Sequence, residues 1–164
     1  EAINRGWITG DAEAWYTNGI KASRAFYGIP ETGSFTVYFY RPGSAGVDKI
    51  QNYDTYTVNA DFNAYYSQEK VKYAGNISTG LTQILQQKYL ALFRHSGLEA
   101  FYNFRRTGVP NFTIGPGTGN SSRIALRFQY PSSERNANAD NYKNALQSQY
   151  AGNDDINGKM WLLQ

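Results

Sequence analysis

The spacing of residues between Ile77 and Pro110 limits the fold more than any other feature of the sequence. In the first half of this segment, mostly apolar residues recur at steps of three and four, which is the spacing of one helical face. They are Leu81, Ile84, Leu85, Lys88, Tyr89, Leu92 and Phe93. Ser78 or Thr79 would cap the start by accepting a bond from a free backbone N–H. We therefore expect a helix through this stretch.

A second helix is expected directly after the first. His95, Ser96 and Gly97 form the corner, and Ser96 with Glu99 has the spacing of a capping box. Gly108 suits the left-handed position after the last turn, and Pro110 prevents the helix from continuing. The two helices would form an antiparallel hairpin whose simplest role is to build the core.

Other segments also have helical spacing. Residues 1–6 are helical in character, and a longer helix is expected from about Asp11 to Tyr27. Residues 1–28 would therefore form a second helix pair that repeats the arrangement of residues 77–108. Two such pairs indicate a tetratricopeptide-like stack, although the strict consensus is absent. A short helix would run from Ser67 to about Tyr73, and a last one would start at Asn138 or Asp140. Residues 160–163 near the C-terminus are apolar, and we expect them to pack against the rest of the chain, because a tryptophan would otherwise be exposed at a terminus.

Between these helices the chain loses helical spacing. Residues 35–40 are β-prone, residues 41–46 form a loop by their Pro and Gly content, and residues 53–66 read as irregular. Residues 111–137 are also irregular, except that Ile124, Leu126, Phe128 and Tyr130 alternate like a half-buried strand. The expected fold is dominated by α-helices, in tetratricopeptide-like hairpins with long irregular loops and a few short strands. Long irregular segments inside a compact domain are often functional.

Composition excludes several classes of protein. The net charge of +3 is scattered along the chain, which argues against a nucleic-acid binder. There is no cysteine, so neither a disulfide nor a thiolate metal site is possible. No apolar run reaches the length of a membrane span. Aromatic residues make up 16% of the chain, and tyrosine serves both cores and binding surfaces.

Motifs for phosphate, metal or catalysis are weak. The glycines of residues 115–119 lack the lysine and the preceding strand of a phosphate-binding loop, so they predict a turn. His95 is the single histidine and sits at a helix corner, which disfavours both a transition-metal site and Ser-His-Asp catalysis. Asp154, Asp155 and Asn157 could hold calcium, but a turn is the simpler interpretation. We expect no cofactor and no metal.

Several segments, in order and spacing, resemble one family. They include the residues 87–93, 97–101 and 105–110, the run Arg127-Phe128-Gln129-Tyr130-Pro131-Ser132-Ser133-Glu134 with the nearby Asn141-Tyr142, the start Glu1-Ala2-Ile3-Asn4-Arg5-Gly6-Trp7, and the closing Asn157-Gly158-Lys159-Met160-Trp161. Together they resemble the C-terminal region of SusD/RagB-family outer-membrane lipoproteins, in the SusD-like nutrient-binding branch. The resemblance covers nearly all of residues 1–164, which we expect to form a single region of a larger lipoprotein.

The resemblance implies a role in nutrient uptake. SusD-like proteins are surface lipoproteins of Gram-negative bacteria that are mostly helical and carry long inserted loops. They bind a glycan or another nutrient without chemistry and cover a SusC-like TonB-dependent transporter. Their lipid anchor is on an N-terminal cysteine, which this chain lacks, so the expected anchor lies on a missing N-terminal part. The ligand residues of the family vary, and none is transferred by motif.

A glycan site needs flat aromatic faces for the C–H faces of sugar rings, and short polar groups for the hydroxyls. The segment 35–66 contains both kinds of residue. Its candidate ligand-binding residues are Tyr38, Tyr40, Arg41, Asn52, Tyr53, Asp54 and Tyr56. The alternative is that these tyrosines only cover the helices beneath them.

Two other functions stay open. One is a helical-repeat scaffold that binds protein partners and ignores sugars. The other is a glycoside hydrolase, which needs two carboxylates facing each other across a cleft. No acidic pair in the sequence stands out for that role, so we expect a protein that is not an enzyme. We also expect exposed apolar surface where further chain would pack.

Overall fold

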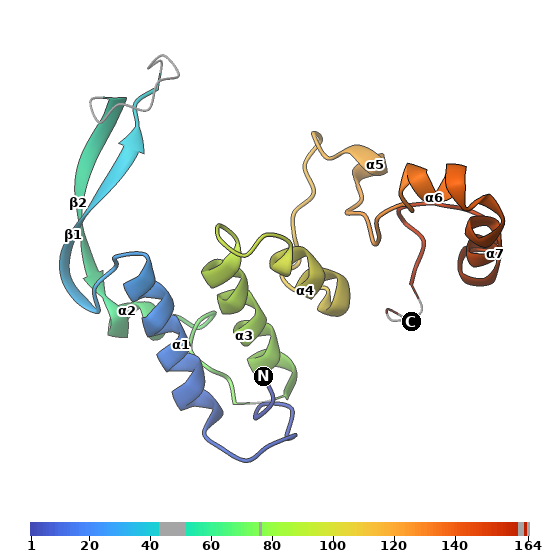
Figure 1. Cartoon of the computed structure of the whole chain (residues 1–164). Helices are drawn as coiled ribbons and strands as arrows, with labels where there is room; N and C mark the ends of the chain where they lie inside the picture. Colours follow the sequence, from blue (N-terminus) through green and yellow to red (C-terminus); the bar gives the residue numbers. More distant parts are fainter. Residues whose placement is uncertain (43–51, 76, 161–162, 164) are drawn as a thin grey trace. The chain divides into compact units, whose positions relative to one another are not determined.

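The computed structural model describes residues 1–42, 52–75, 77–160 and 163, and these form two compact units, Glu1–His95 and Ser96–Gln164 (Figure 1). Helices dominate, and the strands of the described residues form one two-stranded sheet. The predicted fold class, mainly helical with a few short strands, is confirmed. The prediction that residues 1–164 act as a single region remains a prediction.

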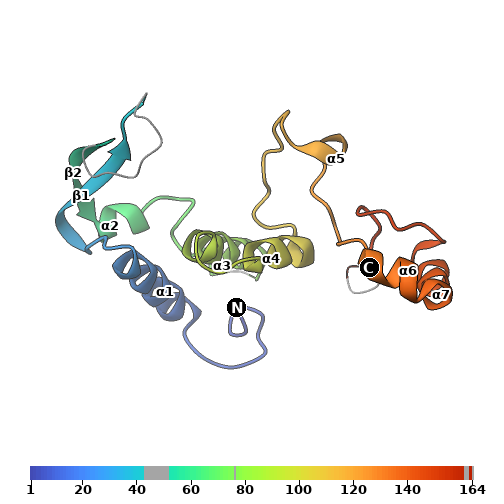
Figure 2. The same ribbon diagram turned by 45° about the horizontal axis from the view of Figure 1, so that its top comes forward.

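Two helices, α1 (Ala12–Phe26) and α3 (Ile77–Leu92), form the frame of the first unit. Figures 1 and 2 show them side by side and running in the same direction. Asp11 caps α1 by accepting a bond of 2.9 Å from the N–H of Ala14. Near the other end, the hydroxyl of Tyr27 donates to the carbonyl of Ala91 at 3.1 Å. The predicted helix from about Asp11 to Tyr27 is confirmed.

An antiparallel β-hairpin follows α1. Strand β1 (Thr32–Tyr40) pairs with β2 (Tyr53–Asp61), and the register runs from Thr32 opposite Asp61 to Tyr40 opposite Tyr53. The β-prone stretch 35–40 is confirmed, but reading residues 53–66 as irregular was wrong. The Asn and Asp residues of β2 hid the alternation of aromatic and β-branched side chains that pairing with β1 stabilises. Most of the predicted loop at 41–46 lies outside the described residues.

The base of the hairpin leads into a short helix, α2 (Phe62–Tyr66). Asp61 caps this helix by accepting a bond of 3.0 Å from the N–H of Ala64. Ser67 is the C-cap of α2, so the expected helix from Ser67 to Tyr73 was wrong. Asp61 can act as an N-cap because its backbone is extended, with φ −141° and ψ 110°, whereas the backbone of Ser67 is already helical, with φ −68° and ψ −12°.

The core of the first unit lies where α1, α2 and the segment 67–75 meet. Tyr16, Ile20, Phe62 and Val71 are buried there, and the hydroxyl of Tyr16 donates to the carbonyl of Val71 at 2.7 Å. Burial raises the pKa of Tyr16 above its ordinary value. Burial, together with a hydrogen bond to Glu13, raises the pKa of Tyr66 to about 12. Both hydroxyls therefore stay protonated and can donate at neutral pH.

The N-terminal residues form turns, so the helix expected for residues 1–6 was wrong. One helical hydrogen bond, from the N–H of Arg5 to the carbonyl of Glu1, forms before Gly6 adopts a left-handed φ of 72°. A segment this short cannot propagate a helix. Asn4 is buried and donates to the hydroxyl of Tyr73 at 2.7 Å. The N-terminal segment thus closes over the start of α3.

The starts of α3 and α4 (Glu99–Thr107) also differ from the expected caps. Helix α3 begins at Ile77, so Ser78 and Thr79 lie inside its first turn. Leu98 occupies the N-cap of α4 and makes no side-chain cap bond, so the predicted capping box did not form. The predicted end is confirmed, since Gly108 is left-handed at φ 71°. Because α3 and α4 belong to different units, their antiparallel packing remains a prediction.

The second unit also contains α5 (Gly119–Ser122), α6 (Ser132–Ala137) and α7 (Ala139–Tyr150). The predicted start of the last helix at Asn138 is confirmed, whereas α6 was not foreseen. The predicted turn in residues 115–119 is confirmed by the bond of 3.0 Å from the N–H of Thr118 to the carbonyl of Gly115. Met160 contacts the guanidinium of Arg105 in the same unit. Residues 161 and 162 of the expected docking tail lie outside the described residues.

The strand expected around residues 124–130 was wrong. The N–H groups of Leu126 and Arg127 both donate to the carbonyl of Ile156, at 2.9 and 3.1 Å, and the segment pairs with no strand in the described ranges. Arg127 is only 5% exposed, forms an ion pair of 2.7 Å with Asp154, and lies 4.1 Å from the ring centroid of Tyr150. A buried arginine, and not a sheet, thus fixes this segment. Asp154 takes part in that ion pair. The N–H of Gly158 donates to the carbonyl of Asp155 at 3.0 Å, which forms a turn where one was predicted.

Gly80 tests the closure of the N-terminal segment over α3. A Cβ at this position would lie 2.8 Å from Tyr73 and 2.9 Å from Asn4, so we expect Gly80→Ala to destabilise the first unit by about 1–3 kcal/mol. The matched control is Gly19→Ala in α1, where nothing lies within 4 Å and the change should stabilise by up to about 1 kcal/mol. Urea denaturation followed by circular dichroism measures both. Equal stability of the two variants would contradict the described packing.

A substitution of Arg127 tests the packing of the second unit. Arg127→Met leaves the carboxylate of Asp154 without its buried ion-pair partner, so we expect a loss of about 3–5 kcal/mol in the free energy of unfolding. Arg123→Met removes an exposed arginine from the same segment and should change stability by less than about 0.5 kcal/mol. Chemical denaturation of both variants provides the comparison, and a small effect at Arg127 would show that the ion pair is dispensable.

Candidate functional site

The seven residues predicted to bind a ligand all lie at the far end of the β-hairpin. Figure 1 shows the hairpin extending away from α1 and α2, with its base at α2. At the far end, Tyr40 pairs with Tyr53, and the N–H of Arg41 donates to the carbonyl of Asn52 at 2.7 Å. The structure therefore brings the predicted residues together in sequence-distant pairs. It also divides them between the two faces of the sheet, because successive residues of a strand point to opposite sides.

One side, which we call the ion-pair face, consists of Phe39, Arg41, Asp54 and Tyr56. The guanidinium of Arg41 donates twice to Oδ1 of Asp54, from Nε at 3.0 Å and from Nη2 at 2.7 Å. The hydrogen bond and the charge of Asp54 raise the pKa of Arg41. The rings of Phe39 and Tyr56 meet edge to face with centroids 5.4 Å apart. The face thus places two aromatic rings beside a compact pair of opposite charges.

The other side, which we call the tyrosine face, consists of Tyr38, Tyr40 and Tyr53. Tyr40 and Tyr53 also meet edge to face, with ring centroids 5.5 Å apart. Tyr38 is 57% exposed. This face offers aromatic rings and hydroxyl groups, and none of its three members is an acidic or basic residue such as Asp or Arg.

Sequence reasoning missed Phe39, although the pattern contained a signal for it. Phe39 is 58% exposed and directly opposite Asp54 in the register. An alternation of Tyr38, Phe39 and Tyr40 in a strand would have indicated that Phe39 shares a face with neither tyrosine. The partner strand was predicted to be irregular. Without a predicted strand pair, there was no register that could place Phe39 on the same face as Asp54.

The alternative that these aromatic residues merely cover the helices holds for only part of the hairpin. Ala60 and Phe62 at the base are buried, and Phe35 and Val37 are half-buried. Phe39, Tyr40 and Tyr56 at the far end are all exposed. Among the predicted ligand residues, Tyr38, Tyr40, Arg41 and Tyr56 are exposed, whereas Asn52, Tyr53 and Asp54 are half-buried.

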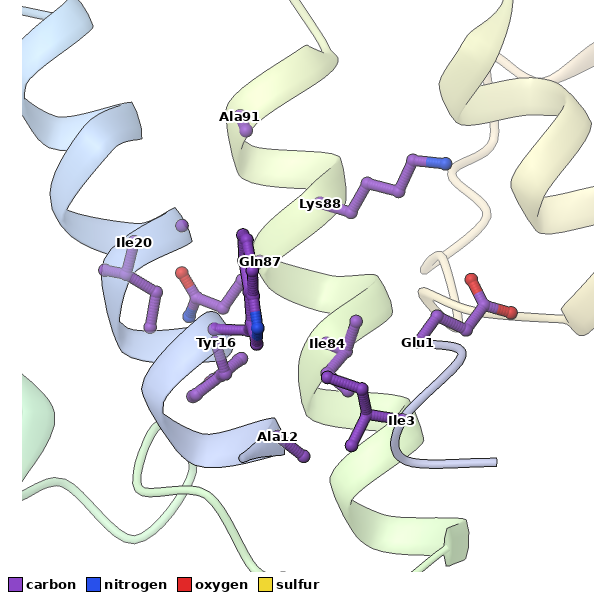
Figure 3. Close-up of a pocket in the computed structure, with 11 residues that line it drawn as sticks. Glu1, Ile3, Ala12, Tyr16, Ile20, Ile84, Gln87, Lys88 and Ala91 are labelled. Atoms are coloured by element: carbon purple, nitrogen blue, oxygen red, sulfur yellow. The ribbon is translucent and has the colours of Figure 1, made fainter. Parts of the chain in front are cut away.

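Two hollows lie elsewhere in the first unit, between α1 and α3. The larger has a volume of about 430 Å³, and the smaller of about 310 Å³. Figure 3 shows Tyr16, Ile20, Ile84 and Gln87 around the larger hollow, with Ile3 from the N-terminal segment nearby. Neither hollow contains any of the seven predicted residues. Their mainly apolar lining suits packed side chains better than sugar hydroxyls.

Carboxylates of the described residues serve structural roles wherever the structure gives them a partner. Asp11 and Asp61 cap helices, Asp54 and Asp154 pair with arginines, and Glu31 pairs with Lys21. In the described ranges, no cluster of three or more His, Asp or Glu side chains could hold a metal ion. His95 is exposed, as expected for a helix corner, and its ring contacts those of Phe26 and Tyr27.

Comparison with known proteins gives one consistent result. The family described as "Susd and RagB outer membrane lipoprotein" matches residues 1–163. The chain belongs to the SusD-like family. A SusD homolog from Bacteroides fragilis is 29% identical, with a TM-score of 0.71 over 99% of this chain and 32% of that one. No curated protein sequence matches the chain.

Two further solved structures connect the SusD-like chain with binding proteins. A Bacteroides vulgatus protein, whose description connects it with nutrient binding at the outer membrane, is 30% identical, with a TM-score of 0.67 over 99% of this chain and 31% of that one. A protein described as chitin-binding is 26% identical, with a TM-score of 0.63 over 99% of this chain and 30% of that one. The chain spans about a third of the length of these solved relatives.

Family membership confirms the predicted location at the bacterial outer membrane, since the family consists of outer-membrane lipoproteins. It also makes this chain a member of a family of binding proteins. Within the described residues, no helix is both long and apolar enough to cross a bilayer.

One side of α1 in this SusD-like chain is apolar and exposed. Trp15 and Phe26 are 71% and 69% exposed, and the smaller Gly19 and Ala22 lie between them. The four positions follow steps of four, three and four, so they form one stripe along the helix. The predicted exposure of apolar surface is thus present on α1, and Trp15 also borders the larger hollow.

We expect the 164-residue chain to self-associate through this stripe, because exposed contiguous apolar surface favours association. The double variant Trp15→Gln/Phe26→Gln should shift sedimentation-velocity profiles toward monomer at equal concentration. Trp7→Gln/Ile8→Gln removes a similar exposed apolar area outside α1 and serves as the control. A monomeric wild type, or an equal effect of both double variants, would contradict the prediction.

Proposed function

We propose that this SusD-like chain takes part in binding a glycan at the bacterial surface, without chemistry, and in delivering it to a SusC-like TonB-dependent transporter. The observation that carries the proposal is the exposed end of the hairpin, where aromatic rings lie beside an arginine–aspartate pair. Membership in a family of outer-membrane binding proteins supports it. A lipid anchor on a further N-terminal part of the protein belongs to the same proposal.

The chemistry of the hairpin end fits a carbohydrate better than it fits other nutrients. Sugar rings present C–H faces that pack on aromatic rings, and their hydroxyls both donate and accept hydrogen bonds. The cross-strand pairs Tyr40–Tyr53 and Phe39–Tyr56 hold the rings in place before a ligand arrives. Such preorganisation lowers the ordering cost of binding.

A second candidate function is a helical scaffold for protein partners. The apolar hollows between α1 and α3 and the apolar stripe on α1 favour it. A scaffold of this kind would bind its partner through the helices and would not respond to changes at the hairpin end. Pull-down of the transporter in the presence and absence of glycan separates the two candidates.

Affinity electrophoresis in gels that contain soluble neutral polysaccharides tests the glycan proposal. We expect retardation by at least one polysaccharide, and about fivefold weaker binding for Tyr56→Ala, because an aromatic contact contributes about 1 kcal/mol. Tyr102→Ala removes a tyrosine of α4 that is 46% exposed and should leave binding unchanged. Absence of retardation by every polysaccharide would refute glycan binding. Release of reducing ends from a labelled oligosaccharide would refute binding without chemistry.

A further inference from the structure

The two faces of the hairpin end differ in their chemistry, and this difference leads beyond glycan binding as such. We propose that the ion-pair face contacts the sugar and that it selects uncharged sugars over acidic ones. The inference rests on the proposed function and adds to it the contacting face and the class of sugar. It depends on the ion pair that Arg41 and Asp54 form diagonally between the two strands at the far end of the hairpin.

The ion-pair face combines the two groups that a sugar needs. Phe39 and Tyr56 are 58% and 53% exposed, so much of each ring is open to a ligand. Beside them, the side chains of Arg41 and Asp54 are 54% and 40% exposed despite their contact. The face therefore has an apolar platform and a polar edge at the same end of the same strands.

The arrangement of the ion pair suits neighbouring hydroxyl groups. Both hydrogen bonds from Arg41 end on Oδ1 of Asp54. A guanidinium has five N–H donors and a carboxylate has two acceptor oxygens, so the exposed pair keeps capacity for further hydrogen bonds. One sugar hydroxyl can accept from the guanidinium while its neighbour donates to the carboxylate. The tyrosine face has no charged member, so it lacks this pairing of a strong donor with a strong acceptor.

The ion pair also decides the charge of the face. Asp54 compensates the charge of Arg41 at a separation of 2.7 Å, and Phe39 and Tyr56 are uncharged. An acidic sugar would meet the carboxylate of Asp54 beside the arginine it seeks, and this repulsion disfavours it. An uncharged sugar meets no such repulsion.

The contacting face is tested by removing two rings from one side at a time. We expect Phe39→Ala/Tyr56→Ala to weaken binding of a neutral polysaccharide roughly tenfold. Tyr38→Ala/Tyr53→Ala removes two rings from the opposite face and should weaken binding less than twofold. Circular dichroism confirms that each variant keeps its fold. If the second pair of substitutions has the larger effect, the assignment of the ion-pair face is wrong.

The selection against charge is tested with matched polysaccharides, namely glycol chitin and carboxymethyl chitin, and dextran and carboxymethyl dextran. Wild type should bind the neutral member of a pair better than the acidic member. Asp54→Asn keeps an oxygen acceptor for Arg41 but leaves its charge uncompensated. We therefore expect it to bind the acidic member roughly two- to fivefold more tightly than wild type at low salt, and to lose this gain at high salt.

The matched control is Glu31→Gln. It also removes one carboxylate from an ion pair of the first unit, with Lys21 at 2.8 Å, and it raises the net charge by the same amount at the base of the hairpin. This variant should show no gain for acidic polysaccharides. A wild type that prefers the acidic member, or equal gains in Asp54→Asn and Glu31→Gln, would overturn the selectivity while glycan binding stands. A wild type that binds neither member of any pair would overturn the proposed function itself.

Discussion

The packing of the segment 67–75 against α1 is the constraint on which the rest of the first unit depends. Helices α1 and α3 run in the same direction. The chain that connects them must therefore travel back from the level of the end of α1 to the start of α3. The hydroxyl of Tyr16 holds this return path by its bond to the carbonyl of Val71, and Gln83 of α3 donates to the carbonyl of Lys72 at 2.7 Å. A buried side chain from each helix thus satisfies the backbone of the connection. Without these bonds, the connection would bury unpaired polar groups or leave the core open to water.

The packing of the segment 67–75 also fixes the base of the hairpin next to the helices. Phe62 lies in the core beside Tyr16 and Val71, so the last residue of β2 is fixed next to the helices. Beyond this base, no third strand among the described residues supports the two strands, and isolated hairpins are marginally stable in water. The cross-strand ring pairs and the Arg41–Asp54 ion pair supply the missing support at the far end. The residues proposed to bind the glycan are therefore also those that keep the strands in register.

The sequence predicted the helices of this chain better than its site. The long helices α1 and α3 and the end of α4 at Gly108 followed from spacing, charge and glycine, which act within a few residues. Strand β2 was not predicted, because its stability comes from pairing with β1, which lies more than twenty positions away in the sequence along part of the ladder. The same dependence on distant partners explains why Leu126 and Arg127 pair with Ile156 although their alternation favours a strand. The residues of the candidate site were found by composition, whereas their division between two faces needed the register.

The short helix caps show a related limit. Ser96 and Glu99 have the spacing of a capping box, yet α4 begins at Glu99 with Leu98 at its cap. Asp61, which was not considered as a cap, begins α2 directly at the end of β2. A capping residue acts only where the backbone on its N-terminal side is free to be extended, and the sheet fixes that condition at Asp61. Local motifs therefore predict which residues can cap, while tertiary structure chooses among them.

Exposed aromatic residues of this chain fall into two groups that their neighbours distinguish. Trp15 and Phe26 on α1 lie with glycine and alanine between them, and small residues allow another element to approach closely. Phe39 and Tyr56 lie beside an ion pair, which would have to lose water if a hydrocarbon surface covered it. A ligand rich in hydroxyl groups replaces that water with hydrogen bonds, so the same degree of exposure has a different meaning at the two places. For this reason we assign carbohydrate to the hairpin end and not to the helices, although both present open aromatic rings.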